Sequence, residues 1–216
     1  MPLINNVIDY EPQENALISE KFESGTFSHS DWSADELMPL RSKIRAFYRS
    51  EQLGICAYCK GDVSLTSAGN AHIEHIAPKS LHLGFIFEPK NLCVVCADCN
   101  TIKRNQEVIN EVPDTFSRSV TLYPRSSGAF KIVHPYFDDY DEHILIKGRI
   151  YIDKSVKGAF TISACKLNRY YHEFDIDDDF VDDGELVREM TEFIDARSSL
   201  KKAQILNRLR DMLINL

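Results

Sequence analysis

Two Cys-x-x-Cys pairs place the strongest constraint on how this chain can fold. They are Cys56-Ala57-Tyr58-Cys59 and Cys96-Ala97-Asp98-Cys99. In each pair a tight backbone turn lets both thiolates reach one ion, and two pairs complete a tetrahedral zinc site. Because four sulfurs leave no open position for water or substrate, we expect the zinc to be structural. The 36 residues between the pairs exceed the roughly 15–20 residues that separate the pairs of a zinc ribbon. We therefore expect the zinc to hold together the two ends of an inserted element.

The cysteines alone leave the ligand register open. Cys93 also forms a Cys-x-x-Cys with Cys96, and buried apolar cysteine is the alternative interpretation for all of these residues. Cys165 is isolated in the sequence, and we expect it in the core. No apolar run is long enough to cross a bilayer, and residues 1–5 lack a signal-peptide pattern. We therefore expect a cytoplasmic protein without membrane contact, whose reduced thiols favour metal binding over disulfides.

Charge is distributed unevenly along the 216 residues. The formal net charge of −8 argues, taken whole, against a nucleic-acid protein. Residues 41–104, however, carry nine bases against five acids and lie between acidic flanks. Phosphate contacts dominate nucleic-acid affinity, so this basic island matters more than the total. Because the island is modest, we expect weak nucleic-acid binding by the chain alone and help from a partner.

Hydrophobic periodicity and turn residues indicate three parts. Residues 1–36 form an acidic N-terminal arm, which we expect to be extended. Residues 37–106 form a helix followed by the module that carries the two cysteine pairs. Residues 107–216 form an α+β region that ends in a long helix. The expected elements are a helix over 37–52, a strand over 71–76, an apolar stretch and a helix within 91–105, strands over 119–122 and 129–134, a hairpin over 143–153, a helix over 161–171, a solvated acidic loop over 173–185 and a helix over 184–216.

The segment between the cysteine pairs contains His72-Ile73-Glu74-His75-Ile76-Ala77-Pro78-Lys79. Its Glu74-His75 pair places a hard oxygen ligand beside an imidazole at the end of a predicted strand. Phosphodiester cleavage needs this combination, since a carboxylate holds a divalent cation and a histidine removes a proton from water. A lone Glu-His pair is weak evidence. Here Asn91 and Asn100 follow it between the two cysteine pairs and just after the second, which makes the combination far more specific.

These motifs together resemble the zinc-containing HNH, or ββα-metal (His-Me finger), endonucleases. The matching stretches are Cys56–Cys59, Glu74–Pro78, Asn91-Leu92 and Cys96–Lys103. The nine-residue step from Asn91 to Asn100 is the one that the family shows, and it favours Cys96 and Cys99 over Cys93 as zinc ligands. The resemblance implies an α+β fold in which a ββα-metal module with a structural four-cysteine zinc site is flanked by helices and a small β region.

The resemblance also implies a role for each matching residue. His75 would be the general base, and Glu74 and Asn100 would bind a single Mg²⁺ or Mn²⁺. Asn91 would hydrogen-bond the loop backbone and orient His75, and Lys103 would neutralise phosphate charge. Hydrolysis of DNA would then leave 5′-phosphate and 3′-hydroxyl ends.

Two further residues of this segment are candidate substrate contacts. His72 faces the same side of the predicted strand as Glu74, so it could support the site or contact phosphate; a packed or solvent-facing histidine is equally consistent. Lys79 lies in the loop after the strand and is a weaker candidate. Many family members carry Asp where Glu74 stands, and the extra methylene bears on metal choice rather than on the presence of activity.

The flanks have a narrower resemblance, to the HNH subunits of retron and Septu antiphage systems. It rests on Gln52–Cys59, His72–Ser80, Thr161-Ile162 and Leu167–Arg169. Those subunits work beside an ATPase, which implies an ATPase partner and a role in bacterial antiphage defence. Two alternatives stay open: a catalytically silent zinc-ribbon adaptor that binds protein or nucleic acid, and a nuclease that acts on RNA.

Overall fold

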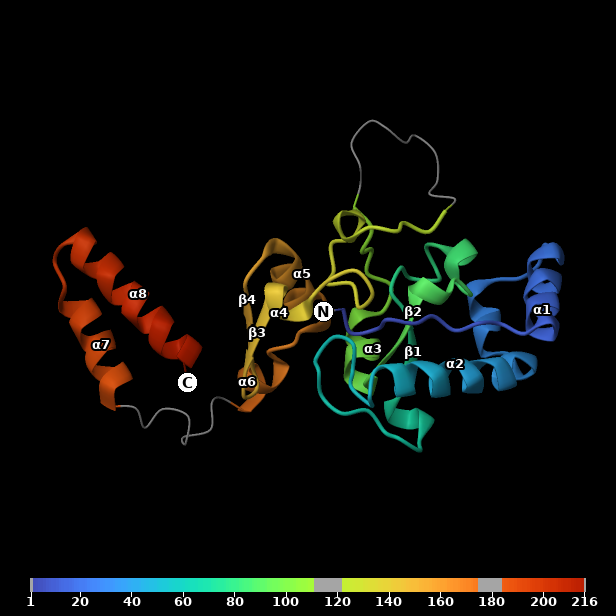
Figure 1. The fold of residues 1–216 in the computed structure, drawn as a ribbon, viewed down its shortest axis with the longest axis horizontal. Helices are drawn as coiled ribbons and strands as arrows, with labels where there is room; N and C mark the ends of the chain where they lie inside the picture. Colours follow the sequence, from blue (N-terminus) through green and yellow to red (C-terminus); the bar gives the residue numbers. More distant parts are fainter. Residues whose placement is uncertain (1, 111–121, 175–183, 216) are drawn as a thin grey trace. The chain divides into compact units, whose positions relative to one another are not determined.

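The computed structural model describes residues 2–110, 122–174 and 184–215 (Figure 1). The chain divides into two compact units, one made of residues up to 146 with residues 151–167, the other of residues 147–150 and from 168 onward. Helices combine with two separate two-stranded sheets, so the α+β class predicted from the sequence is confirmed. Within the described residues, no helix is both long and apolar enough to cross a membrane.

The N-terminal arm differs from the extended segment that we expected, because residues Pro12–Glu23 form helix α1. None of its residues is fully buried, although Leu17 and Ile18 are partly buried against the core, so its apolar pattern in the sequence is weak. The interactions that favour this helix are local to its N-terminus instead. Glu11 and Glu14 form a capping box, and Lys43 pairs with both carboxylates at 3.1 and 2.7 Å.

Helix α2 (Met38–Glu51) occupies nearly the range predicted for it. Leu40, Ile44 and Tyr48 repeat every four residues and are buried, which lays one face of the helix on the core. The chain leaves the helix through Gly54, whose φ of +75° suits glycine. The first turns of the helix face the site described below.

A ββα arrangement occupies the centre of the first unit. Strand β1 (His72–His75) pairs antiparallel with β2 (Leu92–Val95), and Glu74 lies opposite Cys93 in the register. Helix α3 (Ala97–Lys103) follows β2 directly. The strand and helix predicted for this region are therefore confirmed, and the residues with candidate chemistry lie on β1 and α3.

A hairpin of two strands follows, with residues 144–146 and 151–153 in the first unit and residues 147–150 in the second. Strands β3 (Ile144–Lys147) and β4 (Ile150–Asp153) form the predicted hairpin, with Gly148 in its turn. Helices α4 (Tyr140–His143) and α5 (Val156–Cys165) flank it. The strand predicted over 129–134 is wrong, because Phe130 makes only an isolated bridge and the following residues turn around a buried histidine. The strand predicted over 119–122 lies almost wholly outside the described residues.

Two long helices predicted near the C-terminus are each broken in the structure. The helix expected over 161–171 is divided between α5, which ends at Lys166 with a left-handed φ of +43°, and α6 (Arg169–Phe174). The last helix is divided into α7 (Gly184–Asp195) and α8 (Ser199–Asn215). Most of the acidic loop predicted over 173–185 lies outside the described residues.

The break between α7 and α8 has a local cause and an energetic one. The Ser198 hydroxyl accepts a hydrogen bond from the backbone N–H of Lys201 at 3.1 Å, as an N-terminal cap does. Folding back lets the two helices bury Ile205 and Ala196 and pair Arg208 with Glu189. A single straight helix would leave its apolar stripe in water.

Candidate active site

The four cysteines of the two motifs converge on one point. The sulfur atoms of Cys56, Cys59, Cys96 and Cys99 all lie within 4.8 Å of one another. A zinc ion with Zn–S bonds of about 2.3 Å sets tetrahedral sulfur–sulfur edges of about 3.8 Å, and the Cys59 and Cys96 sulfurs are 3.7 Å apart. The cluster therefore fits a structural zinc ion, as the sequence predicted. Cys93 lies outside the cluster, which confirms the register.

Tyrosine hydroxyl groups hold the first cysteine turn in place. Tyr140 donates to the carbonyl oxygen of Tyr58 at 2.7 Å, and Tyr151 donates to that of Cys59 at 2.6 Å. Burial raises the pKa of the Cys56 thiol well above its usual value. Thiols this close to one another cannot all ionise unless a cation lies among them. Ionisation of all four cysteines therefore requires the metal.

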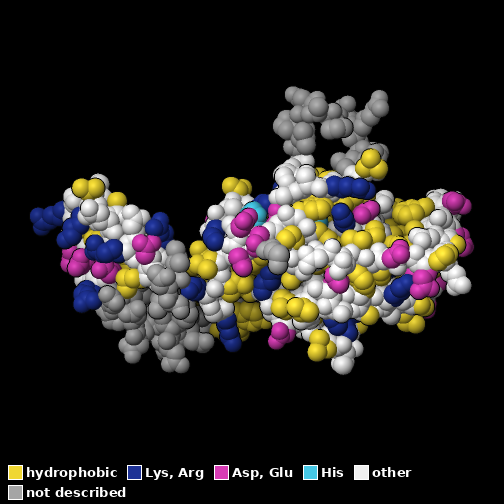
Figure 2. Space-filling view, in the orientation of Figure 1, with side chains coloured by type: hydrophobic (Ala, Val, Ile, Leu, Met, Phe, Trp, Pro, Cys, Tyr) yellow, Lys and Arg dark blue, Asp and Glu magenta, His cyan; other side chains and the backbone are white. Residues whose placement is uncertain are grey.

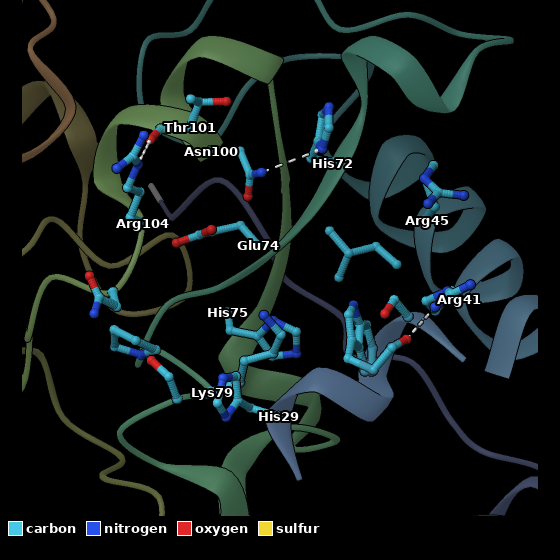
Figure 3. Close-up of a pocket in the computed structure, with 16 residues that line it drawn as sticks. His29, Arg41, Arg45, His72, Glu74, His75, Lys79, Asn100, Thr101 and Arg104 are labelled. Carbon is cyan, nitrogen blue, oxygen red and sulfur yellow. Dashed lines mark hydrogen bonds between the residues drawn. The ribbon is translucent and has the colours of Figure 1, made fainter. Parts of the chain in front are cut away.

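Beside the zinc cluster, a cleft of about 680 Å³ opens over β1 and α3 (Figure 3). It brings together Glu74, His75 and Asn100, which the sequence identified as the reacting centre. His72 and Lys79 line it as well, whereas Asn91 and Lys103 do not. Its full lining is His29, Trp32, Ser33, Arg41, Arg45, His72, Ile73, Glu74, His75, Pro78, Lys79, Ser80, Asn100, Thr101, Arg104 and Asn105.

His75 is held by one hydrogen bond and one aromatic contact. Its Nε2 lies 3.0 Å from the carbonyl oxygen of Ile86, and its ring meets Trp32 edge to face at 4.6 Å between centroids. A carbonyl oxygen only accepts hydrogen bonds, so Nε2 carries the proton and Nδ1 keeps its lone pair. Burial, with Lys79 as the second cause, lowers the pKa of His75 to about 3. The imidazole is thus neutral at physiological pH and free to accept a proton.

Glu74 is a buried carboxylate with one oxygen engaged. Oε1 lies 2.5 Å from Nζ of Lys103 and 3.5 Å from the hydroxyl of Tyr58. Burial raises the pKa of Glu74, and Lys103 opposes this by favouring the charged carboxylate. Oε2 makes no hydrogen bond to a residue in the described ranges. It is therefore available as a metal ligand.

Asn100 is oriented by His72. Nε2 of His72 lies 3.0 Å from the carbonyl oxygen of Gly69 and so donates to it, which leaves Nδ1 to accept from the amide nitrogen of Asn100 at 3.4 Å. The amide oxygen then points toward Glu74, as Figure 3 shows. One carboxylate oxygen and one amide oxygen facing the same space are the hard donors that Mg²⁺ and Mn²⁺ prefer. The donor set fits the cation predicted for this site.

Asn91 and Lys103 act from behind the cleft. Asn91 is fully buried, accepts from the N–H of Ala77 at 2.7 Å and donates to the carbonyl oxygen of Phe85 at 2.9 Å. It thereby fixes the loop that carries the Ile86 carbonyl bonded to His75. Lys103 is also buried, so its position differs from the phosphate contact that we expected. Its last-turn position on α3 points inward, where it pairs with Glu74.

The sequence analysis missed several residues of the cleft. Arg41 and Arg45 reach it from α2, and Arg104 from the end of α3. His29 and Trp32 come from the N-terminal arm. The four-residue spacing of Arg41 and Arg45 on a predicted helix was a signal that could have found this pair. Nothing in the sequence indicates that residues 29–33 meet His75.

Comparison with protein families supports this geometry. Residues 56–106 match the family model of HNH endonucleases. The matched segment contains all four zinc-cluster cysteines as well as Glu74, His75 and Asn100, so it is an HNH endonuclease domain and supports a nuclease function in general terms. Comparison with curated proteins and with solved structures gave no match.

Proposed function

We propose that this protein is a metal-dependent endonuclease that hydrolyses phosphodiester bonds of DNA. The observation that carries the proposal is the convergence of Oε2 of Glu74, the amide oxygen of Asn100 and His75 on one cleft. A zinc-ribbon adaptor needs none of these three groups. The same cleft also presents cations to a phosphate backbone, which suits a polyanionic substrate.

His75 supplies the general base. Its Nδ1 takes a proton from water as the water oxygen bonds to phosphorus, and the bond from phosphorus to the 3′ oxygen breaks. The electron pair stays on the 3′ oxygen, which picks up a proton to give a 3′-hydroxyl, and the other product keeps a 5′-phosphate. An anionic phosphate beside the imidazole raises its proton affinity above that in the empty cleft.

Glu74 and Asn100 would hold Mg²⁺ or Mn²⁺. Such a cation neutralises phosphate charge and stabilises the developing alkoxide. Three other residues act on this centre indirectly: His72 aims the Asn100 amide, Lys103 holds Glu74 in place and favours its charged form, and Asn91 holds the loop behind His75. Lys79 lines the cleft without a carboxylate partner in the described ranges, which suits a phosphate contact.

A nicking assay on supercoiled plasmid DNA with Mg²⁺ or Mn²⁺ tests this function. His75→Ala should reduce cleavage by about 100-fold or more, with zinc content unchanged and a cooperative melting transition retained. His82→Ala is the matched control, because His82 lies outside the cleft lining and pairs with Glu107. Undiminished cleavage by His75→Ala would refute the assignment of the base. Zinc binding without cleavage of DNA or RNA would favour the adaptor.

We further propose that the nuclease works in the cytoplasm beside an ATPase partner in antiphage defence. The support is the resemblance of its flanking segments to the HNH subunits of retron and Septu systems. The negative net charge is consistent with it, since a partner would supply part of the substrate binding. Co-purification of the tagged chain with the product of a neighbouring ATPase gene is the test; a chain that cleaves fully and purifies alone would contradict it.

A further inference from the structure

Helix α2 carries three arginines at four-residue spacing, Arg41, Arg45 and Arg49. The first two line the cleft. Among the described residues, each donates to backbone oxygen alone: Arg41 donates to the carbonyl of Trp32, and Nε of Arg45 donates to that of Ala71 at 2.8 Å. These bonds fix the side chains in place and leave further guanidinium N–H groups for a ligand. The helix lies outside the segment that matches the HNH family.

The cations of the cleft differ from three other cations of the same unit. Lys21, Lys43 and Lys157 pair with carboxylates, and acidic and basic side chains are interspersed on the face that Figure 2 shows. Across the described ranges, none of the cleft's four Lys and Arg side chains forms an ion pair with a carboxylate; they are Arg41, Arg45, Lys79 and Arg104.

Glu74 is the one carboxylate among the described residues that line the cleft, and Lys103 already neutralises it. Four cations therefore share this space without compensation, in a chain whose formal net charge is −8. Mutual repulsion adds to burial in lowering the pKa of Arg45, with Arg49 and Arg41 as the contributing charges. Because these four cations repel one another while the cleft holds no ligand, an anionic ligand stabilises their arrangement.

The arginines also have a defined place relative to the reacting centre. In Figure 3, Arg41 and Arg45 lie on one side of Glu74 and Arg104 lies on the other. A strand that has its scissile phosphate over Glu74 and His75 and follows the cleft toward Arg41 and Arg45 passes along α2. Guanidinium groups present paired N–H donors that match the two free oxygens of a phosphodiester.

We propose that Arg41 and Arg45 form a binding site for a backbone phosphate of the substrate strand adjacent to the scissile phosphate. The helix before the HNH domain thereby adds two phosphate-binding side chains to the cleft of that domain. This inference rests on the proposed nuclease function, because it takes the ligand to be the same strand that is cut.

The test is a titration of a fluorescent DNA duplex with full-length protein that carries His75→Ala to prevent cleavage. Arg41→Gln and Arg45→Gln are each added, and anisotropy is followed over a range of salt concentrations. Lys43→Gln is the matched control, since it removes one charge from the same helix outside the cleft. Each arginine variant should weaken binding about five- to ten-fold at 0.1 M salt. It should also reduce by about one the magnitude of the slope of log binding constant against log salt concentration. Lys43→Gln should change neither quantity.

Arg41→Lys and Arg45→Lys keep the positive charge. They therefore show whether weaker binding by the glutamine variants comes from the lost charge or from misfolding. They should recover most of the salt slope, with equal zinc content in all variants. Binding by both glutamine variants equal to that of Lys43→Gln overturns the phosphate site. If the chain with His75 intact still cleaves DNA in that case, the nuclease function stands without the α2 site. If it cleaves neither DNA nor RNA, the proposed function fails and the inference falls with it.

Discussion

Glu74 and Lys103 form a buried ion pair in which Oε1 and Nζ lie 2.5 Å apart. The same ammonium group donates to the carbonyl oxygen of His75 at 3.3 Å. One cation from α3 thus fixes a side chain and a main-chain group of two consecutive residues on β1. Lys103 is therefore a positioning residue, and its loss should affect both stability and metal binding.

Replacing Lys103 by methionine should destabilise the protein by about 3–5 kcal/mol, because it leaves a carboxylate buried without a partner. Urea unfolding of the zinc-loaded protein measures the loss. The double variant Lys103→Met with Glu74→Gln should recover much of it, since no uncompensated charge remains. Equal stability of the single and double variants would show that the pair does not operate as described.

Removal of a zinc ligand should unfold the HNH domain. Wild-type protein should hold about one zinc ion per chain, and Cys59→Ser should lose it together with the cooperative melting transition. Cys93→Ala is the control, because Cys93 is buried on β2 outside the sulfur cluster. Metal analysis after gel filtration is the measurement. Full zinc retention by Cys59→Ser would contradict the four-sulfur site.

His134 should make the stability depend on pH. It is fully buried, and its Nδ1 accepts from the N–H of Tyr136 at 3.3 Å while Nε2 lies 2.9 Å from the hydroxyl of Tyr123. A proton on Nδ1 would face another donor, and burial lowers the pKa of His134 to about 3. Since the unfolded chain titrates near 6.5, it takes up a proton below that pH and the folded protein does not, so stability falls with acidification.

Chemical denaturation of wild type and His134→Gln between pH 6 and pH 4 measures this contribution. The wild-type free energy of unfolding should fall with a slope up to about 1.4 kcal/mol per pH unit steeper than that of the variant. A difference in the free energy of unfolding that is the same at every pH reports lost packing. The difference in slope between the two curves therefore measures the titration of His134. Parallel curves would mean that His134 titrates alike in both states.

Gly158 is required by the close packing of α5 against α4. A Cβ at this position would overlap the backbone carbonyl of His143, and backbone has little freedom to withdraw. We expect Gly158→Ala to lower stability by about 1–3 kcal/mol. Gly128→Ala is the control because nothing lies near its Cβ position, and thermal melts of the two variants give the comparison. A similar melting temperature for both would contradict the packing described.

Chemistry constrained by spacing was predictable from the sequence. The Cys-x-x-Cys turns, the pair Glu74-His75 and the step from Asn91 to Asn100 all encode local geometry. They identified the zinc cluster, β1 and the residues that converge on the cleft. The four-residue apolar repeat gave α2 nearly to the residue. In each case the relevant contacts are set by a single element or by two elements that the four-cysteine cluster brings together.

Features that depend on packing between distant segments were not predictable. Lys103 has the spacing of a phosphate ligand, yet its environment is decided by Glu74 on another element. Helix α1 has no fully buried residue and so only a weak periodic pattern to recognise. The contact between Trp32 and His75 joins the N-terminal arm to the HNH domain, and only the folded chain shows it.

Helix α3 has only seven residues, yet Cys99, Asn100 and Lys103 all belong to it, and Cys96 caps its start. One added residue turns everything beyond it by about 100° around the axis. An insertion after Cys99 would leave the sulfurs intact while swinging Asn100 away from Glu74. An insertion before Cys99 would detach the helix from its anchor. The segment therefore tolerates substitutions far better than changes in length, and any functional descendant of this chain must keep its residue count between Cys96 and Lys103.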